Sequence, residues 1–307
     1  MINGVINVYK EAGYTSHDVV AKLRGILKQK KIGHTGTLDP DATGVLPVCL
    51  GNGTKLCDML TDKDKIYEVV MLLGTTTDTQ DTSGTVLKKK EVFSSEEEIR
   101  CAINSFIGEY NQVPPMYSAL KVNGKKLYEL AREGKVVERK PRPVRIYDIA
   151  INDVNLKGSQ VKMTVECSKG TYIRTLCQDI GEKLGCGACM CGLKRTKVSS
   201  FVIEESLTLS EIESLVKEDR VLEVITAVDA MFPQYDSIII KEDACRLIYN
   251  GNSFLEQDIS SYKQGKNQAN TVGIEERKVR VYDYQDRFVG IYREVCQGVY
   301  KPEKMFL

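Results

Sequence analysis

The sequence contains no apolar run that approaches the roughly 18 residues of a membrane-spanning helix, so we expect no membrane association. Its first residues do not combine a basic leader with an apolar block, and we therefore expect no secretory signal and a cytoplasmic location. In a reducing compartment the ten cysteines are expected to remain free thiols.

Histidine is also scarce, with two residues in 307, which argues against a metal centre. The densest cysteine cluster is Cys186, Cys189 and Cys191, with Cys177 nearby. Neither a second Cys-x-x-Cys pair nor histidines at ligand spacing accompany it. We therefore expect small buried thiols and no metal. The acids of segment 78–84 likewise lack the alternation and the closing Glu of a calcium loop, and a polar turn is preferred.

The chain carries no overall charge excess, because its formal net charge is +1, but the charge is unevenly distributed. Lys22 to Lys31 holds five basic residues and no acid, which is also compatible with a solvated helix face. Lys121 to Arg145 holds nine Lys or Arg against three Glu and is interrupted by glycine and proline. This second segment is predicted to be a long basic loop suited to a phosphate backbone. Its candidate contacts are Lys121, Lys125, Lys126, Arg132, Arg139, Lys140, Arg142 and Arg145.

Hydrophobic residues make up 42% and charged residues 28% of the chain, as in ordinary globular proteins, and we expect one large and one small domain. Strands and helices alternate without regular repetition, which favours an α/β fold. Predicted strands are Gly4–Val8, Val45–Leu50, Ile66–Leu73 and Val161–Cys167. Predicted helices run from Thr15 or Ser16 to about Gln29, after the capping box at Ser95, from Thr171 to Leu184, and from Ser210.

The pattern changes to short strands near Phe232 to Gln234. Ile238–Ile240, Lys278–Tyr284 and Arg287–Tyr292 are predicted strands, and the last two form a hairpin. A brief helix, Asp243–Tyr249, is predicted to end at Asn250-Gly251. A second, smaller β domain is therefore expected at residues 234–307.

One short stretch carries a distinctive acid, Asp39, in a loop rich in glycine and threonine. Pro40 disfavours the α conformation at Asp39 and removes a competing N–H donor. His34 lies five positions before the acid, and the apolar run Val45 to Leu50 closes the loop. Spacing alone is equally compatible with an Asx-type turn between two strands.

The segment GHTGTLDPDATGVLPVCLGNGTK, residues 33–55, resembles the nucleophile motif of the TruB family of tRNA pseudouridine synthases. Further matching segments follow in the order of the family. They are GYTSHD (13–18), KIYEV (65–69), GTTTDTQD (74–81), QVPPMYSA (112–119) and SKGTYIR (168–174). Together the matches extend from residue 4 to about residue 198.

The resemblance implies a catalytic domain at residues 1–233 with a mixed, largely antiparallel sheet, and a small PUA-like β-barrel at 234–307. It also implies that residues 113–147 form a thumb that closes over an RNA stem-loop. The expected reaction converts uridine to pseudouridine at position 55, in the T-loop of tRNA. Folded tRNA is then the partner, and a monomer with no obligatory protein partner is expected.

The chemistry requires that the N1–C1′ bond of uridine breaks and that the base rejoins through C5. An ionised carboxylate can attack C1′ or the base without a metal or organic cofactor. By resemblance, Asp39 is this nucleophile and Arg174, in the first turn of a predicted helix, pairs with it. Tyr67 and Tyr172 match the tyrosines that stack on the flipped base, and Tyr67 is also the candidate general base.

The target uridine must leave its stack before Asp39 can reach it. The resemblance implies that His34 fills or braces the vacated place, whereas a histidine bonded to its own turn is the simpler reading. Leu193 matches a leucine that lines the uracil pocket, although its pattern alone would place it in the core.

Two other functions remain compatible with parts of the pattern. A noncatalytic RNA chaperone would use the same basic surfaces, and a glycoside hydrolase would use Asp39 with Asp41. Acids on either side of a proline are expected to point apart, which disfavours the hydrolase. The chain also departs from the family in having Lys10-Glu11 where Lys-Pro is usual, which predicts a less rigid turn. Cys189 and Cys191 near Leu193 suggest sensitivity to oxidants.

Overall fold

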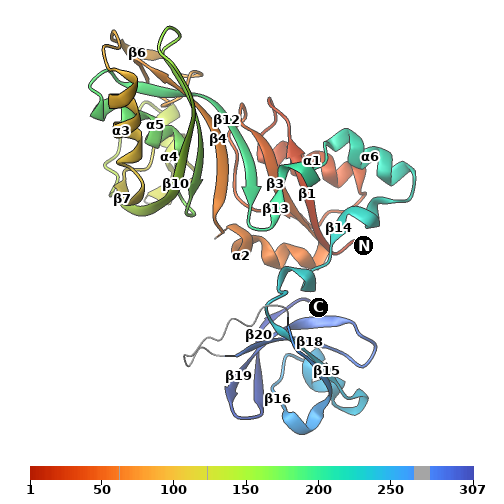
Figure 1. Cartoon of the computed structure of the whole chain (residues 1–307). Helices are drawn as coiled ribbons and strands as arrows, with labels where there is room; N and C mark the ends of the chain where they lie inside the picture. The colour runs from red at the N-terminus through yellow and green to blue at the C-terminus, as the bar shows by residue number, and fades with distance from the viewer. Residues whose placement is uncertain (62, 123, 266–276) are drawn as a thin grey trace.

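The computed structural model describes residues 1–61, 63–122, 124–265 and 277–307, and arranges them around a ten-stranded sheet and a six-stranded sheet (Figure 1). The large sheet has the order β14-β1-β3-β12-β4-β11-β10-β7, with β2 paired to β3 and β13 paired to β12. Its strands are β1 (Gly4–Lys10), β2 (Ile32–His34), β3 (Thr43–Leu50), β4 (Lys65–Leu73), β7 (Gly108–Gln112), β10 (Arg142–Asn155), β11 (Gln160–Cys167), β12 (Ala188–Val198), β13 (Phe201–Val202) and β14 (Ile225–Thr226). All of these pairings are antiparallel except that of β3 with β12, so the predicted mixed, largely antiparallel sheet is confirmed.

Helices pack on the large sheet in two groups, one toward each end of the strand order (Figure 1). Helices α1 (Ser16–Ile26) and α6 (Leu209–Lys217) share an apolar cluster with β1 and β3. Helices α3 (Glu96–Asn104) and α5 (Ile173–Lys183) share another with β4, β10, β11 and β12. The capping box predicted at Ser95 forms, and Thr15, one of the two residues predicted to cap α1, also forms a capping box. Helix α1 ends three residues earlier than predicted.

The central strand β12 is the main element that periodicity did not predict. It pairs in parallel with β3 and in antiparallel with β4, and so joins the two halves of the sheet. In this register Arg195 lies opposite Gly44 on β3 and opposite Tyr67 on β4. The strand therefore brings the loop before β3 close to the middle of β4.

The expected thumb segment, residues 113–147, is only partly a loop. Its last six residues belong to β10, which hydrogen-bonds to β7 and β11 within the large sheet. The remainder carries a short hairpin, β8 (Lys121–Val122) with β9 (Lys125–Lys126), followed by α4 (Leu127–Arg132). A second hairpin, β5 (Thr75–Thr77) with β6 (Val86–Lys89), directly follows β4 in the chain.

The C-terminal sheet has the order β16-β20-β19-β18-β15-β17 and is curled into a half-barrel, whose two outermost strands are not paired with each other in the described residues. Its elements are β15 (Asp236–Ile240), α7 (Cys245–Tyr249), β16 (Phe254–Leu255), β17 (Ile259–Lys263), β18 (Lys278–Tyr282), β19 (Phe288–Cys296) and β20 (Val299–Met305). The predicted hairpin of β18 and β19 is confirmed.

An apolar cluster joins the C-terminal sheet to the large one. Phe232, Ile291 and Phe306 pack with Val5 and Val45, beside helix α2 (Cys57–Thr61). The chain terminus thus returns to the first strand of the large sheet (Figure 1). No helix in the described residues is long and apolar enough to cross a membrane.

Candidate active site

Asp39 and Arg174, which lie 135 positions apart in the chain, form an ion pair. Asp39 lies between β2 and β3, where the buried side chains of Leu38 and Ala42 anchor the loop on either side of it. Arg174 is the second residue of α5. Its Nε lies 3.0 Å from Oδ2 of Asp39 and its Nη2 lies 3.4 Å from Oδ1, so both nitrogens of one fork face the carboxylate.

The two partners differ in their access to solvent. The Arg174 side chain is 8% exposed, whereas that of Asp39 is 38% exposed. Burial of the Asp39 carboxyl raises its pKa above the usual value, and the charge of Arg174 opposes that rise. The arrangement therefore presents a reachable carboxylate whose ionised form depends on the arginine.

Further contacts hold Arg174 in this orientation. Its Nη1 donates to the carbonyl oxygen of Thr79 at 3.1 Å and lies 3.5 Å from Oδ2 of Asp81. Its Nη2 donates to the carbonyl oxygen of Tyr117 at 2.8 Å. The polar turn of residues 78–84 and the start of the thumb segment therefore meet at this arginine, and the turn forms one side of the site.

Lys10 donates hydrogen bonds to the main chain of the Asp39 loop, a role that the sequence alone did not predict. Its side chain is fully buried, and its Nζ donates to the carbonyl oxygens of Ala42 at 2.6 Å, Pro40 at 2.9 Å and Glu11 at 3.1 Å. Burial lowers the pKa of Lys10 to about 8. The sequence drew attention to Lys10 only through the pair Lys10-Glu11, which predicted a less rigid turn and no contact with the Asp39 loop.

Tyr67 lies on β4 and is 7% exposed. It belongs to the same apolar cluster as Leu38 and Ala42, so its ring is beside the Asp39 loop. Leu193 on β12 is partly buried and packs against that cluster. Burial raises the pKa of the Tyr67 hydroxyl, and Arg195 opposes that rise. The structure thus places Tyr67 in the cluster that anchors the Asp39 loop and packs Leu193 against that cluster.

Tyr172 is placed by a buried glutamine to which the sequence analysis assigned no role. Gln112, at the end of β7, donates from Nε2 to the Tyr172 carbonyl at 3.0 Å and accepts from the Tyr172 N–H at 2.8 Å. Tyr172 is the N-terminal cap residue of α5, two positions before Arg174. Gln112 therefore fixes the start of the helix that carries the arginine.

The two histidines of the chain lie against each other. His34, at the end of β2, is half-buried, and its ring meets that of exposed His17 edge to face, with centroids 5.3 Å apart. Burial and the neighbouring His17 lower the pKa of His34. Its buried Nδ1 has no hydrogen-bond partner in the structure.

Most of the predicted basic contacts point outward. Lys121, Lys125, Arg132, Lys140, Arg142 and Arg145 are exposed. Lys126 is half-buried, with its Nζ 5.4 Å from the centre of the Tyr128 ring. Arg139 instead donates to the carbonyl oxygen of Pro114 at 3.1 Å, across the base of the thumb segment. Arg139 is thus used to shape that segment.

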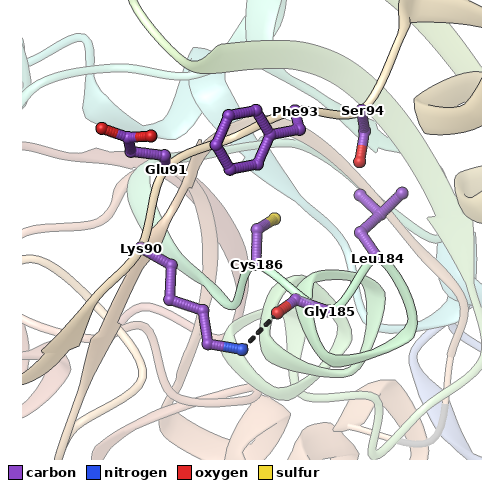
Figure 2. A pocket seen from close by; sticks show the side chains of 7 residues that line it. All are labelled: Lys90, Glu91, Phe93, Ser94, Leu184, Gly185 and Cys186. Atoms are coloured by element: carbon purple, nitrogen blue, oxygen red, sulfur yellow. Dashed lines mark hydrogen bonds between the residues drawn. The ribbon is translucent and has the colours of Figure 1, made fainter.

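The cysteine cluster is only partly buried, which corrects one expectation. Cys186 and Cys189 are buried, but Cys191 is exposed because it lies at a register shift between β12 and β4. Among the described residues, no group of three or more His, Cys, Asp or Glu is placed to hold a metal ion. Cys186 instead contributes to a surface hollow of about 420 Å³ with Lys90, Glu91, Phe93, Ser94, Leu184 and Gly185 (Figure 2). None of the predicted site residues lines that hollow.

Comparisons with known proteins identify the family of the chain. Residues 24–173 match a family model described as TruB family pseudouridylate synthase, N terminal domain. Residues 174–233 match a model of the tRNA pseudouridylate synthase B C-terminal domain. A tRNA pseudouridine synthase B from Lachnoclostridium phytofermentans is 53% identical, with all of both chains covered, and one from Clostridium novyi is 45% identical with the same coverage.

The fold is also found in solved structures. A chain in a crystal structure of a Cbf5-Nop10-Gar1 complex superposes with a TM-score of 0.72 at 28% identity, and the match covers 99% of this chain and 85% of that one. A chain in an H/ACA ribonucleoprotein bound to a substrate RNA gives a TM-score of 0.70 at 26% identity. From its full-length relatives, the chain belongs to the TruB family of tRNA pseudouridine synthases, which are isomerases.

Proposed function

We propose that this protein converts uridine 55 in the T-loop of tRNA to pseudouridine, with Asp39 as the nucleophile. The observation that carries the proposal is the forked contact between Arg174 and the partly exposed Asp39 carboxylate. Arg174 favours the ionised form of a carboxyl group that burial would otherwise protonate. The fork also aims the carboxylate, which is the geometry that a nucleophile requires.

The reaction is an isomerisation, so every atom of the substrate is retained. The Asp39 carboxylate attacks either C1′ or the base, the N1–C1′ bond breaks, and the base turns and rejoins the ribose through C5. The bond that Asp39 formed then breaks, which restores the free carboxylate. C5 loses a proton and N1 gains one, which keeps the proton count unchanged. A carboxylate and a general base are sufficient for these steps, so the proposal requires no metal or organic cofactor.

The roles of the surrounding side chains follow from the family motifs that their segments resemble. Tyr67 and Tyr172 stack on the flipped uracil, Leu193 lines its pocket, and Tyr67 is also the general base. His34, held edge-on by His17, occupies the place that the base leaves. Its lowered pKa keeps the ring neutral near pH 7 and therefore suited to stack in the RNA loop.

RNA recognition is assigned to the thumb segment and to the C-terminal domain. The exposed lysines and arginines of residues 121–145 contact the phosphates of the T stem-loop, and the protein reads the shape of a folded loop. We assign the catalytic domain to residues 1–233 and the smaller RNA-binding domain to 234–307. The protein acts in the cytoplasm as a monomer, and an obligatory protein partner is not required.

The test is site-resolved detection of pseudouridine after incubation with an unmodified tRNA transcript. The expected product is pseudouridine at position 55, and a matched transcript with cytidine at that position should remain unmodified. Product at another uridine, or no product from a correctly folded transcript, would contradict the proposal. A protein that refolds tRNA without making pseudouridine would instead be an RNA chaperone.

A further inference from the structure

Arg195, on the central strand β12, is a buried cation that the account above leaves without a function. It is 1% exposed and is the largest of the fully buried side chains in the described residues. Removing a guanidinium from water is unfavourable unless partners compensate for the lost hydration. A charged side chain at such a buried position therefore indicates a specific role in the site.

Arg195 lies between the nucleophile loop and Tyr67. Its Nε donates to the carbonyl oxygen of Val45, on β3, at 2.8 Å. A side chain on Gly36, in the same loop as Asp39, would come within 3.8 Å of its Nη1. Across the sheet, Tyr67 is its register partner on β4. The guanidinium thus lies near Gly36 of the Asp39 loop, on a residue that is paired with Tyr67.

A purely structural role explains only part of this arrangement. One donor is sufficient to bind the Val45 carbonyl, and a neutral glutamine could supply it. Nη2 of Arg195, however, is buried with no hydrogen-bond partner. Leaving a buried donor unpaired is unfavourable, and more so when the donor is charged. This spare donor is therefore available to a negative charge that develops beside it.

Tyr67 is the group beside which such a charge would form. The titratable groups that face its hydroxyl are Arg195 from β12, Cys167 from β11 and Asp39 from the loop. Arg195 is the cation among these three. The charge of Arg195 lowers the pKa of Tyr67, against a larger rise caused by burial, whereas Cys167 and Asp39 raise it. Among these three groups, Arg195 is therefore the one that favours ionisation of the hydroxyl.

We propose that Arg195 is a positioning residue for Tyr67, which holds the phenol oxygen against the nucleophile loop and stabilises its phenolate form. The inference rests on the proposed function, in which the Tyr67 phenolate accepts the proton that C5 of the uracil loses. That transfer converts phenolate to phenol while N1 gains a proton from solvent. The unpaired Nη2 of Arg195 donates to the oxygen while that oxygen is negative.

The test is the pH dependence of single-turnover pseudouridine formation on an unmodified tRNA transcript, from about pH 6 to about pH 10. Wild type is compared with Arg195→Gln, Arg195→Lys and the control Lys197→Gln, which removes an exposed positive charge two residues along the same strand. RNA affinity is measured for each variant in an Asp39→Asn background. Thermal unfolding of each variant reports whether it is folded.

With Arg195→Gln, we expect the rise of the rate with pH to move upward by about one pH unit, a loss of about tenfold below the midpoint. Arg195→Lys keeps the charge but loses the fork, and its pH profile should lie between those of wild type and Arg195→Gln. Lys197→Gln should follow wild type, and RNA affinity should be unchanged in all variants.

An unmoved pH profile in Arg195→Gln, or a loss confined to RNA affinity, would overturn the inference. If Arg195→Gln does not fold, Arg195→Lys decides. A profile moved upward from that of wild type supports the inference, whereas a folded Arg195→Lys with the wild-type profile would overturn the proposal that the Arg195 fork holds the phenol oxygen. The proposed function is tested separately, by pseudouridine formation in the wild-type protein. If wild type makes no pseudouridine at any pH, that function fails, whereas an active wild type with an unmoved variant profile rejects only the role of Arg195.

Discussion

Replacing Arg174 by methionine removes the cation that faces Asp39 while keeping a side chain of similar length. Breaking a buried ion pair costs about 3–5 kcal/mol, and because Asp39 is 38% exposed we expect the lower value of about 2–3 kcal/mol here. The carbonyl oxygens of Thr79 and Tyr117 also lose a donor, at about 1 kcal/mol each. We therefore expect the variant to be less stable by about 4–5 kcal/mol, measured by urea unfolding.

The same substitution should change the pH profile of the reaction. The pKa of Asp39 is already raised by burial, and Arg174 opposes that rise, so its removal should raise the pKa further. A protonated carboxyl is not a nucleophile, and the rate should therefore decline at a higher pH than in wild type as the solution is acidified. Single-turnover rates from about pH 5 to about pH 8 measure this limb.

Arg174→Lys is the matched control because it keeps the charge and removes the fork. Its acid limb should remain close to that of wild type, while its rate falls about 100-fold because the carboxylate is no longer aimed. An acid limb that does not move in Arg174→Met, or a lysine variant with the wild-type rate, would refute the reasoning that Arg174 both ionises and orients Asp39.

The same loop supports two further predictions. A Cβ on Gly44, where φ is +104°, would lie 2.1 Å from the Arg195 carbonyl oxygen, whereas a Cβ on Gly36, where φ is +79°, would have its nearest neighbour at 3.8 Å, an ordinary van der Waals contact. Gly44→Ala should therefore destabilise the protein by about 3 kcal/mol or more and Gly36→Ala by only about 1–2 kcal/mol in thermal unfolding. Comparable losses in both variants would contradict this explanation. Because burial lowers the pKa of His34 below its ordinary 6.5, the folded state binds fewer protons than the unfolded state just below that pH, and stability should fall as pH falls through this window. His34→Gln should lose this component of the pH dependence of the melting temperature, and an unchanged pH dependence would count against it.

Local patterns in the sequence predicted the elements whose signals are local. The helix caps at Thr15 and Ser95 are hydrogen bonds between residues three positions apart, and both lie at predicted helix starts. Strand β12, in contrast, reads as ACMCGLKRTKV, with a glycine and three basic residues in a central position. Its basic side chains are compensated by distant groups, such as the Val45 carbonyl that binds Arg195, and periodicity contains no information about such partners.

The site also combines residues that local sequence signals predict with residues whose partners are distant in the chain. The sequence placed Asp39 in a loop and Arg174 at a helix start, but their pairing across 135 residues came from resemblance to a family and not from spacing. Lys10 and Gln112 were missed because each acts on main-chain groups of another segment. A side chain whose partners are backbone atoms leaves no complementary residue type in the sequence, so such supports become visible only in three dimensions.

The most direct test of the account compares two acids of one loop. Asp39 faces Arg174, whereas Asp41, two residues further on, is exposed. The measurement is single-turnover formation of pseudouridine at position 55 by Asp39→Asn and Asp41→Asn, with RNA affinity measured in parallel. The account predicts no product from Asp39→Asn despite near-normal RNA binding, and nearly full product from Asp41→Asn. Pseudouridine formed by Asp39→Asn at the wild-type rate would show that Asp39 is not the nucleophile.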